Sequence, residues 1–246
     1  MVEWPSEILT KKEINLIVKS INDSKQQYNQ WNAKRNLGFE NGKYLDRWNY
    51  IFANLKNAFS ESPFLTYHVP RGKLWEFLII YNTDSKFMYL LMREDTFRNI
   101  RRQKDRAYHY IRVLNSKNFN LQDEKIQKIN FFSGFEDISF EYLDEDLERM
   151  IKEIKDEVKG CANILYSENA DGVKKISANF ANYELDIFKS YDLTKYITAN
   201  VDDIIDTKVD VATVQPVIPL SIRADKLKEK KILNDETKKQ ENETKD

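Results

Sequence analysis

Near the start of the chain, apolar residues recur every three or four positions, a spacing that predicts an amphipathic helix. Thr10 followed three residues later by Glu13 marks its first turn, because each side chain of such a capping box can bond to the other residue's free backbone N–H. The apolar face consists of Ile14, Ile17, Val18 and Ile21. A second stripe predicts a helix from Tyr44 to Phe59, and the polar segment 29–43 predicts an exposed loop between the two helices.

Three short apolar runs then follow, at residues 64–69, 73–81 and 86–93. They are rich in β-branched and aromatic residues and are separated by brief turn-forming segments, a pattern that predicts an antiparallel meander of three strands. The middle run is almost continuously apolar. We therefore expect the middle strand to be covered on both faces, by the preceding helices on one and by later structure on the other.

Residues 93–112 carry seven Lys or Arg against three acids. Apolar spacing predicts a helix here that Thr96 can cap and that continues to about Arg106. Alternation of polar and apolar residues in 108–113 would instead allow a strand beyond that point, so either structure stays open there.

A second charged helix is predicted at 142–158, where the apolar face is regular and acids dominate the other positions. Gly160 follows it in a C-cap position. Residues 161–188 then predict a second β-hairpin around the turn 169–172, and the proline-containing segment 209–222 predicts an extended edge strand.

The predicted fold class is therefore α+β: N-terminal helices packed on an antiparallel β-meander, followed by a basic helix, an acidic helix and a second β-hairpin. We expect a single domain over 1–222, with a possible sub-boundary near 115–140. Residues 223–246 are charged and nearly free of aromatic residues. We expect this tail to be disordered.

Composition adds that the chain has enough bulky apolar residues to form a core, with 41% hydrophobic residues among 246. Cys161 is the single cysteine, and the N-terminus has no pattern of a secretory signal. The apolar runs are much shorter than the roughly 20 residues that cross a bilayer. These features predict a cytoplasmic protein without a membrane partner.

A net charge of −1 hides a marked asymmetry along the chain. Residues 1–135 carry a net charge of +8, and residues 136–246 carry −9. Within the second part, 136–157 holds ten acids against three bases. Such a division predicts partners of complementary charge rather than a particular fold.

The basic segment 93–112 is the candidate binding element, for nucleic acid or an acidic protein surface. Arginine suits bidentate phosphate contacts, and interleaved tyrosines can stack on bases. The candidate residues are Arg98, Arg101, Arg102, Lys104, Arg106, Tyr108, Tyr110 and Arg112. The alternative interpretation is an ordinary solvated helix face. The acidic segment 136–157 is equally a candidate for a basic protein partner, for pairing with the basic helix, or for contact with a second copy in a homo-oligomer.

No motif points to a reaction, and we expect no cofactor, no metal site and no catalytic residue. The chain contains neither a P-loop nor a G-x-G-x-x-G pattern, and two histidines with one cysteine make no conventional zinc site. We interpret His68 and His109 as partly packed side chains, and Cys161 as a buried residue at the start of a strand.

The order of a helix, three antiparallel strands, a helix and a strand resembles the core of the PD-(D/E)XK nuclease superfamily. Members place an acid on the second strand and an acid-x-lysine on the third, and these hold a divalent metal beside the scissile phosphate. Here the second strand offers Glu76, but the third, KFMYLLMR, has no acid-x-lysine. The resemblance implies at most a degenerate core, with a nuclease or nucleotide-processing enzyme as an alternative.

The run RGKLWEFLIIYNTDSKFMYLLMREDTFRNIRR resembles a domain of uncharacterised proteins from low-GC Gram-positive bacteria and their phages, over Tyr44 to Leu114. No catalytic residue belongs to that pattern. The resemblance implies a bacterial or phage accessory protein, in the conflict between phage and host. The function we expect is non-enzymatic, charge-complementary binding; a salt-sensitive oligomeric structural protein is a further alternative.

Overall fold

A computed structural model describes residues 8–35, 39, 41–72, 75–103, 109–122 and 140–197. All of them belong to the first of the two units into which the chain divides, Met1–Ile204. The predicted edge strand 209–222 and the predicted tail 223–246 lie outside the described residues, as does most of the segment 115–140 around the expected sub-boundary. The domain limits therefore stay predictions.

The six strands of the sheet lie in the order of the sequence. They are β1 (Phe64–Arg71), β2 (Trp75–Asn82), β3 (Phe87–Arg93), β4 (Gly160–Asn169), β5 (Gly172–Ala181) and β6 (Ile187–Asp192). Neighbouring strands are antiparallel except for β3 and β4, which run parallel over seven residue pairs. The sheet thus consists of two antiparallel meanders joined along one parallel pair.

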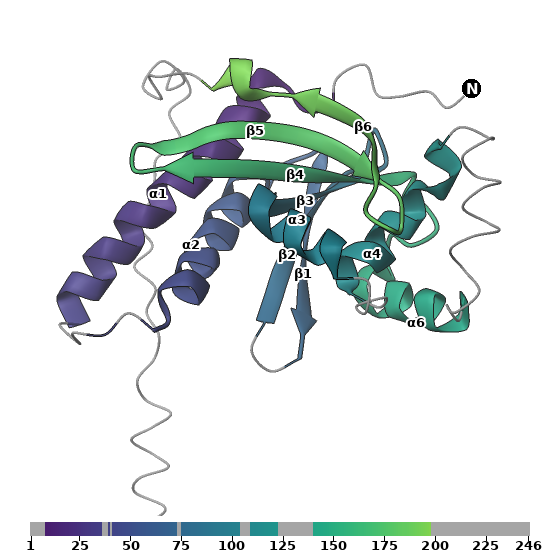
Figure 1. Cartoon of the computed structure of the whole chain (residues 1–246), viewed down its shortest axis with the longest axis horizontal. Helices are drawn as coiled ribbons and strands as arrows, with labels where there is room; N and C mark the ends of the chain where they lie inside the picture. Colours follow the sequence, from purple (N-terminus) through teal and green to yellow (C-terminus); the bar gives the residue numbers. More distant parts are fainter. Residues whose placement is uncertain are drawn as a thin grey trace, which may run out of the picture. The chain divides into compact units, whose positions relative to one another are not determined.

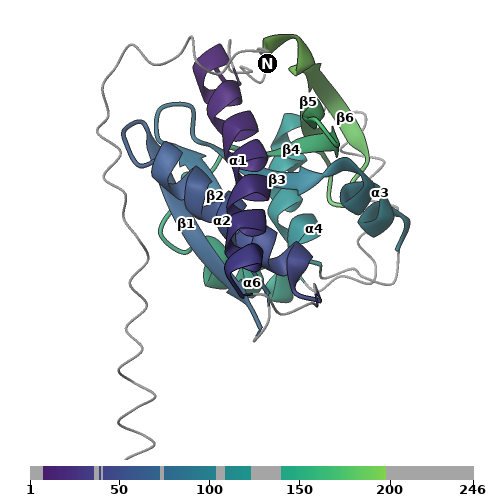
Figure 2. The same ribbon diagram turned by 90° about the vertical axis from the view of Figure 1, so that its left-hand side faces the viewer.

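The helices cover the two faces of this sheet (Figures 1 and 2). On one face lie α1 (Lys11–Arg35) and α2 (Lys43–Ala58). The connection from β3 to β4 supplies the helices of the other face, which are α3 (Glu94–Arg102), α4 (Tyr110–Asn115), the 3₁₀ helix η1 (Ser116–Leu121) and α6 (Phe140–Ile151). A second 3₁₀ helix, η2 (Thr194–Tyr196), follows β6. The α+β class is confirmed.

Two local predictions are confirmed at atomic detail. In the capping box, the Thr10 N–H donates to Glu13 Oε2 at 2.7 Å and the Glu13 N–H donates to Thr10 Oγ1 at 3.3 Å. The middle strand is buried on both faces, since Leu78 and Ile80 join the core beneath α1 and α2 while Ile79 joins the core beneath α4 and α6. Because both faces of β2 are covered, apolar residues occupy both of them, and the strand shows no alternation of polar and apolar residues.

Three boundaries differ from the prediction. Helix α1 continues to Arg35, so residues 29–35 are helical rather than a loop. Helix α3 begins at Glu94, directly after β3, with Arg93 as its N-cap; Thr96 is a residue of the helix and not its cap. It ends at Arg102, and α4 follows at Tyr110, so residues 110–113 are helical rather than a strand.

Gly160 is not the C-cap of the acidic helix, which ends at Ile151 and continues in turns. It is the first residue of β4, paired with Phe87 of β3. A Cβ at this position would lie 2.6 Å from Leu121 Cδ1 and 2.8 Å from Phe87 Cε1. Glycine is required here by close packing rather than by helix termination.

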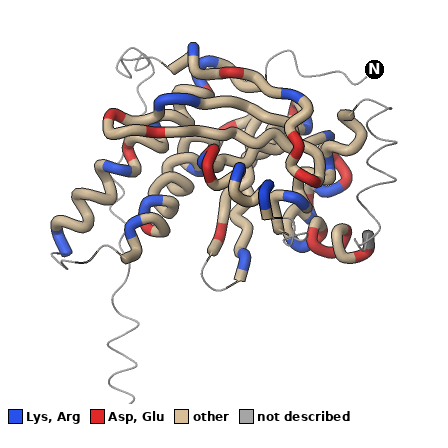
Figure 3. The backbone as a smooth tube through the Cα atoms, in the orientation of Figure 1, with Lys and Arg blue, Asp and Glu red and all other residues tan. Residues whose placement is uncertain are grey.

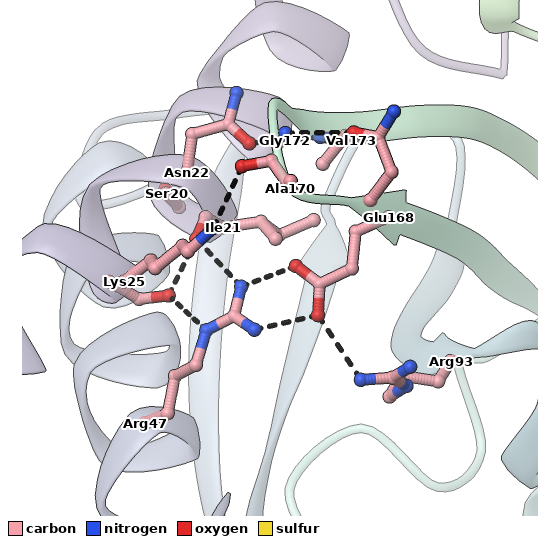
Figure 4. A network of polar contacts seen from close by, with 12 residues as sticks. Ser20, Ile21, Asn22, Lys25, Arg47, Arg93, Glu168, Ala170, Gly172 and Val173 are labelled. Carbon is pink, nitrogen blue, oxygen red and sulfur yellow. Dashed lines mark hydrogen bonds and ion pairs between the residues drawn. The ribbon is translucent and has the colours of Figure 1, made fainter.

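A shared carboxylate ties α2 to the sheet (Figure 4). The guanidinium of Arg47 donates to both oxygens of Glu168, at 2.6 and 2.5 Å, and Arg93 donates to the same carboxylate at 3.1 Å. Nearby, Lys25 of α1 donates to the carbonyl of Ala170 at 2.8 Å. Bidentate geometry and the low exposure of Glu168 make these stronger contacts than surface ion pairs.

Buried asparagines connect the helical crossover to the second meander. Asn118 accepts from the Cys161 N–H at 2.7 Å and donates to the carbonyls of Cys161 and Ala181, each at 2.8 Å. Asn163 donates to Asn115 Oδ1 at 2.8 Å, and Asn115 donates in turn to Asn163 Oδ1 at 3.2 Å. The three asparagines are fully buried, so these bonds fix η1 and the end of α4 against β4 and β5.

We predict that Asn118→Ala lowers the free energy of unfolding by about 3 kcal/mol, because one buried N–H and two buried carbonyls lose a partner. Urea unfolding followed by circular dichroism measures the change. Asn99→Ala, at an exposed position of α3, is the matched control and should change stability by less than about 0.5 kcal/mol. Equal midpoints for the two variants would contradict the structural role of Asn118.

A polar cleft beside helix α3 as the candidate binding site

A cleft of about 380 Å³ lies between α3 and the outer strands of the second meander. Its strand residues face the same side because of the register, in which Ser177 pairs with Asp192 and Asn179 with Ser190. Helix α3 packs against β4 and forms the opposite wall. The lining residues are Glu94, Phe97, Arg98, Arg101, Leu165, Lys175, Ser177, Asn179, Ile187, Ser190 and Asp192.

Three basic side chains of the cleft are held by exposed ion pairs. Arg98 contacts Glu94 at 3.0 Å, and Lys175 lies 3.6 Å from the same carboxylate. Arg101 contacts Asp186 at 2.6 Å. Because the arginine side chains are 57% and 50% exposed, each pair stabilises the fold by only about 0–1 kcal/mol. A phosphate can therefore replace these carboxylates at little cost.

The floor of the cleft is a fixed set of hydrogen-bonding groups. Asn179, which is buried, accepts from Ser190 Oγ at 2.7 Å and donates to Ser177 Oγ at 2.8 Å. The Asn163 side chain donates to the Asn179 carbonyl at 3.2 Å, which joins the floor to the buried asparagines. At the rim, hydrogen bonds from Thr194 hold the pKa of Asp192 below its usual range, so this carboxylate is ionised at neutral pH.

Not all the predicted binding residues reach this surface. Arg98 and Arg101 line the cleft, and Arg102 is exposed at the end of α3. Lys104, Arg106 and Tyr108 lie outside the described residues. Part of the basic segment is thus brought together with β5 and β6, and no sequence pattern predicts this proximity.

Arg112 is a correction, because it is an interior residue and not a surface contact. It is 1% exposed, and its guanidinium donates to backbone carbonyls. The acceptors are the carbonyls of Ile100, Arg101, Gln103 and Tyr183. The charge is also paired with Glu184 at 3.2 Å. Arg112 therefore holds the end of α3 to the turn between β5 and β6.

Tyr110 is also packed rather than presented to a base. Its ring stacks on Phe77 with centroids 4.3 Å apart, and burial raises the pKa of its hydroxyl to about 12. A ring with one face on the core has little surface for stacking. The predicted base platform at Tyr110 is therefore not formed in this structure.

The described acids of the segment 136–157 do not pair with the arginines of α3. Asp146 pairs with Arg71 and Arg149, Asp144 and Glu148 pair with Lys155, and Glu157 pairs with Lys86. Figure 3 shows acidic positions gathered along α6, away from α3. Among the described residues, the two charged segments do not neutralise each other.

The order of the strands agrees with the nuclease alternative, but the described residues form no catalytic cluster. Glu76 of β2 is half-exposed and contacts His68 Nε2 at 2.7 Å. A nuclease of this kind would need an acid-x-lysine on β3. Leu91 and Arg93 stand near the end of this strand instead. Within the described part of the chain, no three His, Cys, Asp or Glu side chains gather to hold a metal ion.

Two other interpretations of single residues are confirmed. Cys161 is fully buried at the start of β4, and burial raises the pKa of its thiol well above the usual range. His109 caps α4, its side chain accepting from the Ile111 N–H at 3.4 Å. Both residues act in packing and local hydrogen bonding.

The strand side of the cleft is not among the candidate residues predicted from the sequence. In β5, Lys175, Ser177 and Asn179 alternate with Ile176 and Ala178. Such alternation predicts one buried face and one polar face, which is common in antiparallel sheets and does not by itself mark a site. From the sequence alone it predicts a hairpin strand and no wall of a cleft.

A family model described as a family of unknown function (DUF5986) matches residues 6–242. No curated protein and no solved structure matches the chain. None of the described helices is both long and apolar enough to cross a membrane.

We predict that Arg112→Met lowers the free energy of unfolding by about 2–4 kcal/mol, because buried carbonyls and a carboxylate lose their shared donor. Arg98→Gln, which removes an exposed arginine 14 positions earlier, should change stability by less than about 0.5 kcal/mol. Urea unfolding of the two variants measures the difference. Equal losses would contradict the distinction between an interior and a surface arginine.

Proposed function

We propose that the chain, which belongs to the family of unknown function DUF5986, is a non-enzymatic protein that binds single-stranded nucleic acid in the cleft beside α3. One observation carries the proposal. Arg98, Arg101 and Lys175 surround a floor of serine and asparagine side chains in a cleft of about 380 Å³. The cleft thus combines cationic side chains, which can bind phosphates, with neutral hydrogen-bonding side chains, which can bind sugars or bases.

The dimensions of the cleft favour a single strand over a duplex. Its volume is at the lower end of the roughly 300–1,000 Å³ of ligand sites, enough for one or two nucleotide units. Arginine donates to phosphate through a planar fork, and the exposed pairs with Glu94 and Asp186 exchange readily for a phosphate. These features support nucleic acid ahead of an acidic protein.

The resemblance seen in the sequence extends the proposal to an accessory protein of bacteria or their phages, acting in the cytoplasm and in the conflict between phage and host. Nothing in the cleft requires a metal or a cofactor for this role. Binding alone, through charge that salt can screen, is the activity that the arrangement supports.

We predict that Arg98→Gln combined with Arg101→Gln weakens binding of a labelled single-stranded oligonucleotide by about tenfold or more at low salt. Loss of two phosphate contacts to a single strand should also lower the magnitude of the slope of log affinity against log salt by about 1.4. Fluorescence anisotropy over a salt series measures both quantities, with and without Mg²⁺ to detect any strand cleavage.

The control is Lys11→Gln with Lys12→Gln, which removes the same charge from exposed positions of α1 on the other face of the sheet. Its affinity should stay within about twofold of the parent. Absence of binding by the parent at low salt, or equal weakening in both double variants, would overturn the proposal. Preference for polyglutamate over the oligonucleotide would point to an acidic protein instead.

A further inference from the structure

A second cavity, of about 360 Å³, lies between the first turns of α2 and the start of β2. Its walls include two tryptophans, Trp48 and Trp75, and two carboxylates, Asp46 and Glu76. Pairing of β2 with β3 begins only at Ile79, so the first residues of β2 extend beyond that pairing. The cavity is separate from the cleft beside α3, because α2 and α3 cover opposite faces of the sheet.

The two indole rings form a corner. Their planes meet at 83° with centroids 6.3 Å apart. Phe52 stacks on Trp48 at 5.0 Å and meets Trp75 edge-on at 6.5 Å, which holds both rings in place from the core side. The edge of one ring meets the face of the other, so a cation can approach only the ring faces that are left towards the cavity, within about 6 Å of a ring centroid.

The carboxylates add charge of the same sign as the ring faces. Glu76 is 53% exposed and keeps one hydrogen-bonding contact, with His68. Asp46 lies in the first turn of α2, and its Oδ2 lies close to Gly42. Among the described residues that line the cavity, none is basic. Aromatic faces and carboxylates together favour a positively charged group over a neutral or anionic one.

Exposed apolar side chains occur at this cavity, in Leu45, and in the sequence just before it, which favours a macromolecular partner. Tyr44 is 74% exposed and Leu45 is 47% exposed, and Phe39, a few residues earlier, is 78% exposed. Half of the large exposed apolar residues in the described part of the chain fall in this short segment. Clustered apolar exposure of this kind marks protein-binding surfaces.

We propose that the cavity between α2 and β2 binds an arginine or lysine side chain from a basic segment of a partner protein. The guanidinium or ammonium lies against the parts of the Trp48 and Trp75 rings that line the cavity and pairs with Asp46 or Glu76, while the partner's neighbouring residues contact Tyr44 and Leu45. This site is opposite in charge preference to the α3 cleft and independent of it. The chain can then hold a nucleic acid on one face and a basic protein on the other.

The test uses the full chain and an acetylated, amidated Gly-Arg-Gly-Arg-Gly peptide, with the citrulline version as the neutral isostere. Isothermal titration calorimetry should show binding of the arginine peptide and at least about tenfold weaker binding of the citrulline peptide. Asp46→Asn combined with Glu76→Gln should lower the affinity for the arginine peptide by about tenfold. Trp75→Leu should lower it by about threefold or more.

The matched control is Glu145→Gln with Glu153→Gln, which removes two exposed acids from the segment 136–157 and leaves the cavity untouched. Its affinity should stay within about twofold of the parent. Near-ultraviolet circular dichroism of each variant verifies an intact fold. Failure of the parent to bind the arginine peptide, equal affinity for the citrulline peptide, or equal weakening by the control pair would overturn the proposal.

Lys73 is next to Gly72 in the sequence and outside the described residues, so a variant tests its influence directly. Lys73→Met removes a positive charge that competes with the peptide, and equal or tighter peptide binding is expected. Weaker binding by this variant would contradict a cation-selective cavity. Oligonucleotide affinity measured in parallel reports on the α3 cleft, so failure of one site is distinguishable from failure of the other.

Discussion

The parallel pairing of β3 with β4 is the contact on which the rest of the structure depends. It joins two meanders that are each held by local antiparallel turns, and it brings Phe87 beside Gly160 and Arg93 beside Tyr166. Both hydrophobic cores cross this line, so neither face of the sheet is complete without it. Gly160 and the contacts of Asn118 with Cys161 lie at one end of the pairing, Asn163 lies in its middle, and Glu168 lies just beyond the other end. Apolar packing alone does not distinguish one register of β3 and β4 from another. The polar contacts therefore fix this register.

The same pairing explains how two cavities with different linings belong to one domain. The first meander and α2 provide the tryptophan and carboxylate cavity, and the second meander with α3 provides the arginine-lined cleft. The sheet between them is buried on both sides, so the two surfaces are held apart by a rigid layer. The first lining contains the carboxylates of Asp46 and Glu76, whereas the second combines three basic side chains with Glu94 and Asp192.

Local signals in the sequence were sufficient for most elements of the fold. The capping box at Thr10, the three runs of the first meander and the hairpin turn at 169–172 depend on neighbours a few residues away, and they appear as predicted. The misplaced residues depend on distant partners. From the sequence, Gly160 looks like a helix cap, but in the structure it is required by close packing with Leu121. Arg112 likewise looks like a surface charge, but its guanidinium donates to four backbone carbonyls in the interior. Half of the α3 cleft was missed for the same reason, since β5 and α3 are adjacent only in three dimensions.

The position of β4 in the sequence also sets the order in which the sheet can be completed. About 65 residues separate the end of β3 from the start of β4. At roughly 5–20 residues per second, a ribosome needs about 3–13 s to make that interval. During that time β3, whose residues are almost all apolar, is the open edge of a half-finished sheet. A nascent chain paused between the two strands is therefore the form of this protein most exposed to aggregation, and the crossover helices are the first segments able to shield it.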